Sequence, residues 1–171
     1  MSRAGTIDGP RFAVEREVVT GALEIGDLPR LAELGCDAAA LRYVVRGGPD
    51  ANGRAALTVE VNGPLRVTCQ RCLGALEFPL TVTSVLELAH AQVEIDAADD
   101  ERDRVLASKA MDVAALVEDE AILALPMIPV HASCEAAGGP ARREEASPFA
   151  ALAGLQTSGA GPRGPGRKPK T

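Results

Sequence analysis

Thr68-Cys69-Gln70-Arg71-Cys72-Leu73-Gly74 is the stretch that decides the fold, because its CxxC motif separates two segments that both alternate as β-strands do. Leu65, Val67 and Cys69 alternate with polar residues before the motif, and apolar and polar residues alternate from 76 to 88 after it. A period of two indicates strands with one buried face. We therefore predict two antiparallel strands with the CxxC motif at the corner between them.

The strands on both sides of the motif also limit its chemistry. A CxxC in a strand-to-strand corner, followed by a glycine that can adopt a positive φ at Gly74, directs two sulfurs toward one point, as in half of a zinc-ribbon site. A thioredoxin-type motif would instead lead from a strand into a helix. A dithiol oxidoreductase is therefore disfavoured.

A closed structural zinc site needs four ligands, so a CxxC pair requires two more from elsewhere in the chain. An HxxC spacing joins His131 to Cys134 and could place an imidazole and a thiolate on one short turn. Cys69, Cys72, His131 and Cys134 are therefore the candidate metal ligands. In the other interpretation these cysteines are reduced and pack as small apolar side chains, while His131 lies in an exposed loop.

Of these two interpretations, we expect the one without zinc, and hence no cofactor. It places Cys69 and Cys72 close together and reduced, with Cys134 in a loop too mobile to complete a tetrahedral site. Arg71 should then project outward and, with Arg66, contact nucleic-acid phosphates or a protein partner.

Composition limits the classes of protein that this chain can represent. Its 171 residues suffice for one domain and some tail, and 46% of them are hydrophobic although only 2% are aromatic. The net charge of −6 argues against an overall basic nucleic-acid-binding surface. Four cysteines without a secretory leader indicate reduced thiols, and no run approaches the roughly 18 apolar residues of a membrane span. We expect a cytoplasmic protein.

The remaining pattern predicts an α+β fold. It is an antiparallel meander sheet that can curl into a partial barrel, with one main covering helix and short flanking helices. Expected strands are residues 12–20, 41–46, 57–61, 65–69 and 76–88, and expected helices are 27–35 and 112–125. In the main helix, Glu118 and Asp119 should point away from the apolar side and Glu120 should lie at its edge.

Three segments are expected to contribute little to the core. Residues 90–109 are acidic and aperiodic, which indicates a solvated loop, with a carboxylate metal site as the alternative. The chain should divide into a single α+β domain at 1–135, a linker with a short C-terminal helix at 136–158, and a disordered basic tail at 159–171. The basic tail could contact nucleic-acid phosphates, or it could be a solubilising terminus with no partner.

Taken together, residues 65–73, 117–131 and 147–152 resemble the YceD family of large ribosomal RNA subunit accumulation proteins. The resemblance covers about residues 10 to 155. Cys69, Arg71 and Cys72 match the family's CxRC motif, residues 118–126 its acidic-to-apolar helix end, and residues 148–149 its C-terminal motif. The long basic tail departs from the family.

The resemblance implies a cytoplasmic ribosome-biogenesis factor needed for synthesis, processing or stability of large-subunit (23S) rRNA. Its expected partner is that rRNA or a large-subunit ribosomal protein, with no membrane and no small-molecule substrate. The alternatives are a zinc-binding or thiol-based module and an rRNA-processing hydrolase. The sequence holds only two histidines, no nucleophile elbow and no phosphate-binding glycine loop, so we expect no enzymatic activity.

Overall fold

The computed structural model describes residues 5–38, 40–98 and 102–134. The linker, short helix and basic tail expected at 136–158 and 159–171 lie outside the described residues. No helix in the described part of the chain is long and apolar enough to cross a membrane.

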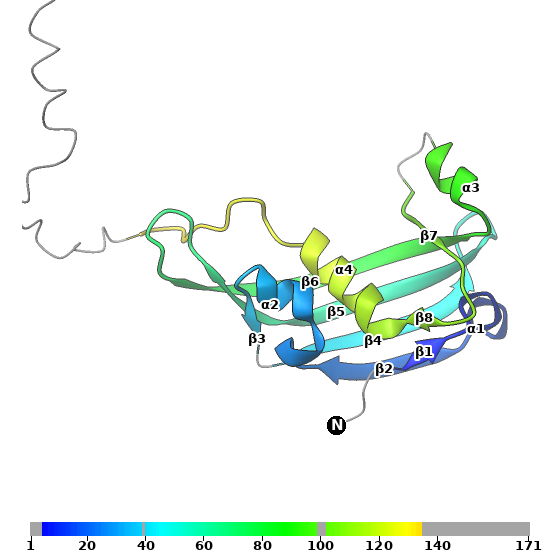
Figure 1. Cartoon of the computed structure of the whole chain (residues 1–171), viewed down its shortest axis with the longest axis horizontal. Helices are drawn as coiled ribbons and strands as arrows, with labels where there is room; N and C mark the ends of the chain where they lie inside the picture. The colour runs from blue at the N-terminus through cyan, green and yellow to red at the C-terminus, as the bar shows by residue number, and fades with distance from the viewer. Residues whose placement is uncertain (1–4, 39, 99–101, 135–171) are drawn as a thin grey trace, which may run out of the picture. The chain divides into compact units, whose positions relative to one another are not determined.

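The fold is a mostly antiparallel sheet with helices packed on it (Figure 1), which confirms the predicted α+β class. Its strands follow the order β2-β4-β5-β6-β7, and β6 and β7 form its one parallel pair. The bounds are β2 (Val18–Leu23), β4 (Leu41–Pro49), β5 (Ala55–Thr68), β6 (Ala75–Ala89) and β7 (Arg104–Leu106). The short β3 (Asp37–Ala38) also pairs with β5. The described strands leave the sheet open, so it does not close into a barrel.

The β5–β6 hairpin dominates the sheet, and its tip carries the CxxC motif. The register runs from Ala56 opposite Glu87 to Thr68 opposite Ala75. Beyond the sheet, β1 (Thr6–Ile7) and β8 (Met111–Asp112) form a separate two-stranded pair. The two long strands thus carry the motif to one end of the sheet.

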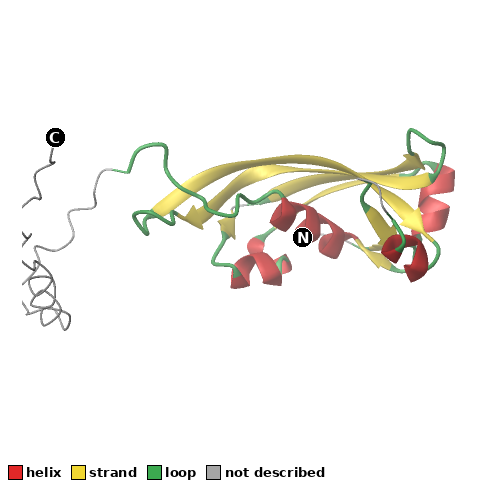
Figure 2. Cartoon of the chain, turned by 90° about the horizontal axis from the view of Figure 1, so that it is seen from above, coloured by secondary structure: helices red, strands yellow, loops and turns green. Residues whose placement is uncertain are grey.

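Helices α2 (Pro29–Glu33) and α4 (Val113–Leu123) lie against the same face of the sheet (Figure 2). Alternate residues of β4 and β5 are buried beneath them, among them Leu41, Tyr43, Val45, Val59 and Val61. Helix α4 begins where the sequence predicts, because the Asp112 carboxylate accepts a hydrogen bond from Ala114 N at 2.9 Å. A short 3₁₀ turn (Ile25–Asp27) leads into α2.

The strand predicted over residues 12–20 is wrong. That segment contains α1 (Gly9–Glu15) followed by β2. Asp8 caps the helix by accepting from Arg11 N at 3.1 Å, and Arg16 ends it in the left-handed conformation with φ 53°. Phe12 is buried from this helix rather than from a strand.

The structureless loop predicted over residues 90–109 is also wrong. The segment forms α3 (Gln92–Asp96) and then β7, which pairs with β6 in the register Glu87 to Arg104. The pairing brings Arg104 beside the buried carboxylate of Glu87, at 3.6 Å from Nε to Oε1, and Arg54 and Arg102 also form ion pairs with it. A buried carboxylate is costly unless it is paired. The three arginines therefore compensate the buried charge of Glu87 on β6.

Candidate metal centre at the tip of the β5–β6 hairpin

The CxxC motif folds as a tight turn between β5 and β6. Cys69 N donates to Gly74 O at 2.9 Å, and Leu73 N donates to Cys69 O at 2.9 Å. Leu73, rather than the expected Gly74, adopts the left-handed conformation, with φ 59°. The turn that brings the Cys69 and Cys72 sulfurs together therefore holds one non-glycine residue in a strained backbone conformation.

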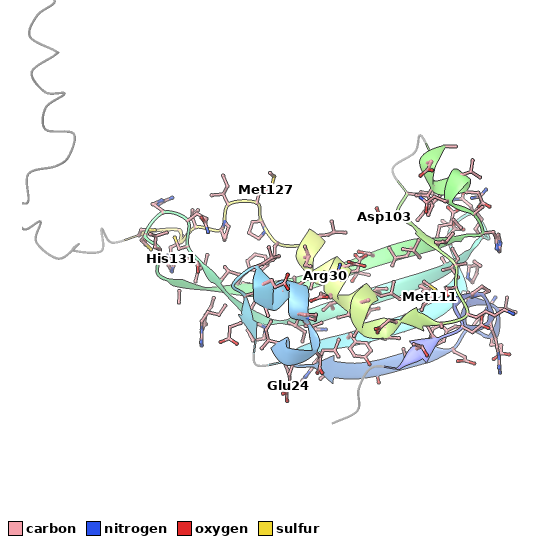
Figure 3. The ribbon with its side chains drawn as sticks, in the orientation of Figure 1. Glu24, Arg30, Asp103, Met111, Met127 and His131 are labelled. Atoms are coloured by element: carbon pink, nitrogen blue, oxygen red, sulfur yellow. The ribbon has the colours of Figure 1, made fainter. Side chains whose placement is uncertain are left out.

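A second segment reaches this turn from the far end of α4. After Leu123 the chain forms no further helix or strand up to residue 134, and it runs back to the hairpin tip (Figure 1). Gln70 N donates to Pro129 O at 2.8 Å, which joins the two segments through their backbones. His131 lies at the tip as a result (Figure 3).

The two segments bring all four candidate ligands together. Cys69 Sγ lies 3.6 Å from Cys134 Sγ, and His131 Nδ1 lies 3.4 Å from Cys72 Sγ and 3.8 Å from Cys134 Sγ. The four ligand atoms all lie within 4.8 Å of one another. A tetrahedral zinc ion, with Zn–S of about 2.3 Å and Zn–N of about 2.0 Å, holds its ligand atoms about 3.5–3.8 Å apart. The three separations given above lie within about 0.3 Å of that spacing.

The structure brings Cys134 to the cluster, whereas the expectation that its loop is too mobile to complete a tetrahedral site stays a prediction. Cys134 is half-buried and contacts both Cys69 and His131. The structure places Cys69 and Cys72 close together, as expected, and that both are reduced stays a prediction. Cys36 is buried elsewhere and takes no part in the cluster.

The histidine tautomer suits a metal ligand. His131 Nε2 lies 3.0 Å from Ala75 O, and a carbonyl oxygen can only accept, so Nε2 carries the proton. The lone pair then resides on Nδ1, the nitrogen that faces the cysteines. Metal-bound histidines are oriented in this way by a backbone carbonyl on the other ring nitrogen.

Backbone N–H groups surround the most buried sulfur of the cluster. Cys69 is 0% exposed, and burial opposes its ionisation. The backbone N–H groups of Cys72, His131 and Arg71 nevertheless outweigh burial and lower the pKa of Cys69 to about 5. Burial and the neighbouring Cys69 and Cys72 sulfurs act in the other direction on Cys134 and raise its pKa. Three thiolates this close together repel one another, so they do not all ionise easily. A cation bound among them would favour the ionised form of all three.

The two arginines predicted as binding residues differ in their surroundings. Arg71 is exposed in the turn, as expected. Arg66 is exposed on β5, but its Nη1 lies 3.3 Å from the carboxylate of Asp37. Apolar side chains are also exposed in the turn and in the segment after α4: Leu73 is 76% exposed, Ile128 68% and Met127 100%.

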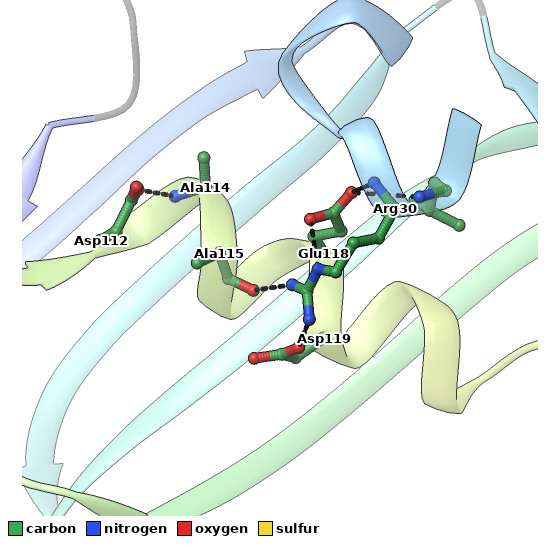
Figure 4. Close-up of polar contacts among 7 residues, drawn as sticks. Arg30, Asp112, Ala114, Ala115, Glu118 and Asp119 are labelled. Atoms are coloured by element: carbon green, nitrogen blue, oxygen red, sulfur yellow. Dashed lines mark hydrogen bonds and ion pairs between the residues drawn. The ribbon is translucent and has the colours of Figure 1, made fainter. Parts of the chain in front are cut away.

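The sequence interpretation missed a second polar feature, where Glu118 of α4 meets the N-terminus of α2. Its Oε1 accepts from Arg30 N at 2.7 Å and from Leu31 N at 3.1 Å, and its Oε2 accepts from Arg30 Nε at 2.8 Å (Figure 4). Glu118 is only 3% exposed, so the prediction that it points away from the buried side is wrong. Glu120 is likewise buried rather than at the edge. The available signal was that Leu28, which precedes α2, cannot cap a helix.

A family model described as "Large ribosomal RNA subunit accumulation protein YceD" matches residues 57–156. The match includes the CxxC turn, α4 and the HxxC segment. No curated protein and no solved structure matches the chain.

Proposed function

Because the chain belongs to the YceD family of large ribosomal RNA subunit accumulation proteins, we propose that it is a ribosome-biogenesis factor for large-subunit (23S) rRNA. It supports the synthesis, processing or stability of that rRNA in the cytoplasm. The observation that carries the proposal is the family match, which spans both segments of the hairpin-tip cluster.

We propose that the protein acts by binding rather than by catalysis. His131 is the one histidine that touches other ionisable side chains of the cluster, and the second histidine, His90, is exposed at the end of β6. The buried carboxylates Glu118 and Glu87 are engaged by arginines. Among these described groups Cys72 and His131, at 3.4 Å from Sγ to Nδ1, come closest to pairing a nucleophile with a base. Both belong to the four-residue cluster, so we assign them to structure rather than to catalysis.

The proposed contact surface is the hairpin tip, where Arg71 and Leu73 are exposed in the turn, together with the exposed apolar side chains of Met127 and Ile128 in the segment after α4. Arginine and methionine are enriched in protein interfaces. Few aromatic rings and a net charge of −6 disfavour base stacking and a broad contact with phosphates. The partner favoured by these features is a large-subunit ribosomal protein. In this arrangement Cys69 and Cys72 shape the turn that presents Arg71, and Arg66 flanks it.

Replacing Arg71 with alanine should weaken the partner contact by about 2 kcal/mol, as truncation of an interface arginine often does. In cells that depend on the variant, the ratio of 23S to 16S rRNA should fall while the melting temperature of the purified protein stays the same. Arg11→Ala is the matched control, because Arg11 is also exposed but lies on α1, at the other end of the sheet, paired with Glu15. If the ratio of 23S to 16S rRNA falls equally in both variants, or does not fall in Arg71→Ala, the hairpin tip is not the contact surface.

The nature of the partner can be tested in the same cells. A tagged wild-type chain should capture a large-subunit ribosomal protein after ribonuclease treatment, and Arg71→Ala should capture less of it. Direct ultraviolet crosslinking of 23S rRNA to the chain, with capture abolished by ribonuclease, would instead show that RNA itself is the partner.

A further inference from the structure

We propose that Cys69, Cys72, His131 and Cys134 bind one structural zinc ion, which fastens the segment after α4 to the tip of the β5–β6 hairpin. The ligand atoms lie within 4.8 Å of one another, and three of their separations, 3.4, 3.6 and 3.8 Å, are close to those that a tetrahedral ion imposes. The inference stands apart from the proposed function, since it concerns what holds the tip together and not what the tip contacts.

The ligand atoms of the cluster indicate which metal it would bind. Three thiolates and one imidazole suit zinc, whereas calcium and magnesium require oxygen ligands. Four protein ligands also close the coordination sphere, and Cys69 is fully buried, so no position remains for a substrate. The site is therefore structural rather than catalytic.

Surrounding groups are arranged as they are around a bound metal. Ala75 O fixes the His131 ring so that Nδ1 faces the sulfurs, at 3.0 Å from Nε2. His131 N points at Cys69 Sγ from 3.4 Å, and such N–H donors stabilise a thiolate. Both contacts join the HxxC segment to the hairpin. A pair of cysteines that only shaped the turn would not require them.

The segment that the ion would fasten has little else to hold it. Residues 124–134 form no helix or strand, and Met127 and Ile128 are exposed. Besides contacts to the cluster itself, the hydrogen bond from Gln70 N to Pro129 O joins the segment to the turn. A metal that bridges two segments distant in sequence can supply folding free energy where packing does not.

The first test is the metal content of the full-length chain, purified without an affinity tag and without added metal. We expect one equivalent of zinc per chain by plasma mass spectrometry, and cobalt(II) substitution should give the absorption bands of a tetrahedral thiolate site. Protein with reduced thiols that contains no zinc and takes up none when zinc is supplied would overturn the proposal. A Cys69–Cys134 disulfide in freshly isolated protein would overturn it as well.

Matched variants assign the ligands. Cys134→Ser and His131→Ala should each lower the zinc affinity at least about 10-fold, whereas Cys36→Ala and His90→Ala should keep one equivalent. If the ligand variants fail to fold, hydrogen exchange of the wild-type chain provides the same test. Chelation should speed exchange in residues 126–134 by about 10-fold or more while leaving the centre of β4 and β5 protected. Unchanged exchange after complete removal of zinc would contradict a fastening role.

Discussion

Replacing Glu118 with alanine is expected to lower the free energy of unfolding by about 3 kcal/mol, because it leaves buried donors without an acceptor. The carboxylate accepts from two backbone N–H groups at the start of α2 and from the Arg30 guanidinium. No other side chain caps that helix. Urea denaturation followed by circular dichroism measures the loss.

Asp119 provides the control for Glu118, since it is the next residue and bonds the same arginine. Its carboxylate lies 2.5 Å from Arg30 Nη1, but its side chain is 51% exposed, where solvent screens the pair. Asp119→Ala should therefore cost less than about 1 kcal/mol. Equal losses for the two variants would show that Glu118 does not cap α2.

Replacing Gly47 with alanine is expected to destabilise the protein by about 3 kcal/mol, because α1 packs with its backbone directly on β4 at this position. A Cβ at Gly47 would lie 2.6 Å from Phe12 C and 2.8 Å from Ala13 Cα, and it would also overlap Phe12 O. These are main-chain atoms of a helix, so the helix itself would have to move. Thermal and urea denaturation both report this loss.

Gly48 is the control, because it is the neighbouring residue of the same strand and has nothing within 4 Å of an added Cβ. Gly48→Ala should be neutral or stabilise by up to about 1 kcal/mol, since alanine restricts the unfolded chain. A Gly47→Ala variant as stable as Gly48→Ala would contradict the close approach of α1 to β4.

Two elements, the β5–β6 hairpin and α4, could be predicted from the sequence alone because their local patterns are unambiguous. The β5–β6 hairpin follows from its unbroken alternation, and α4 follows from the Asp112 cap and the prolines after Leu125. The helix α1 was missed because its apolar residues happen to alternate, while Asp8 and Pro10 signalled a helix start. The strand β7 has only three residues and depends on pairing with β6, a contact that no local pattern encodes.

The sequence predicted which residues make up the candidate site, but it did not predict that they meet in space. Ligand chemistry and the CxxC and HxxC spacings identified the right four residues, but their convergence depends on how the chain after α4 returns to the hairpin. That path is set by tertiary contacts, such as Gln70 N to Pro129 O, and sequence spacing does not determine it. The strand expected at residues 41–46 likewise ended too early, since Gly47 lies within β4 and packs against α1.

The central claim is that this protein supports the accumulation of large-subunit rRNA, and pulse-labelling of rRNA after depletion of the protein tests it most directly. Labelled 23S rRNA should fall relative to 16S rRNA within a few generations, and wild-type protein supplied from a second gene copy should restore the ratio. An unchanged ratio of 23S to 16S rRNA in cells shown to lack the protein would contradict the claim.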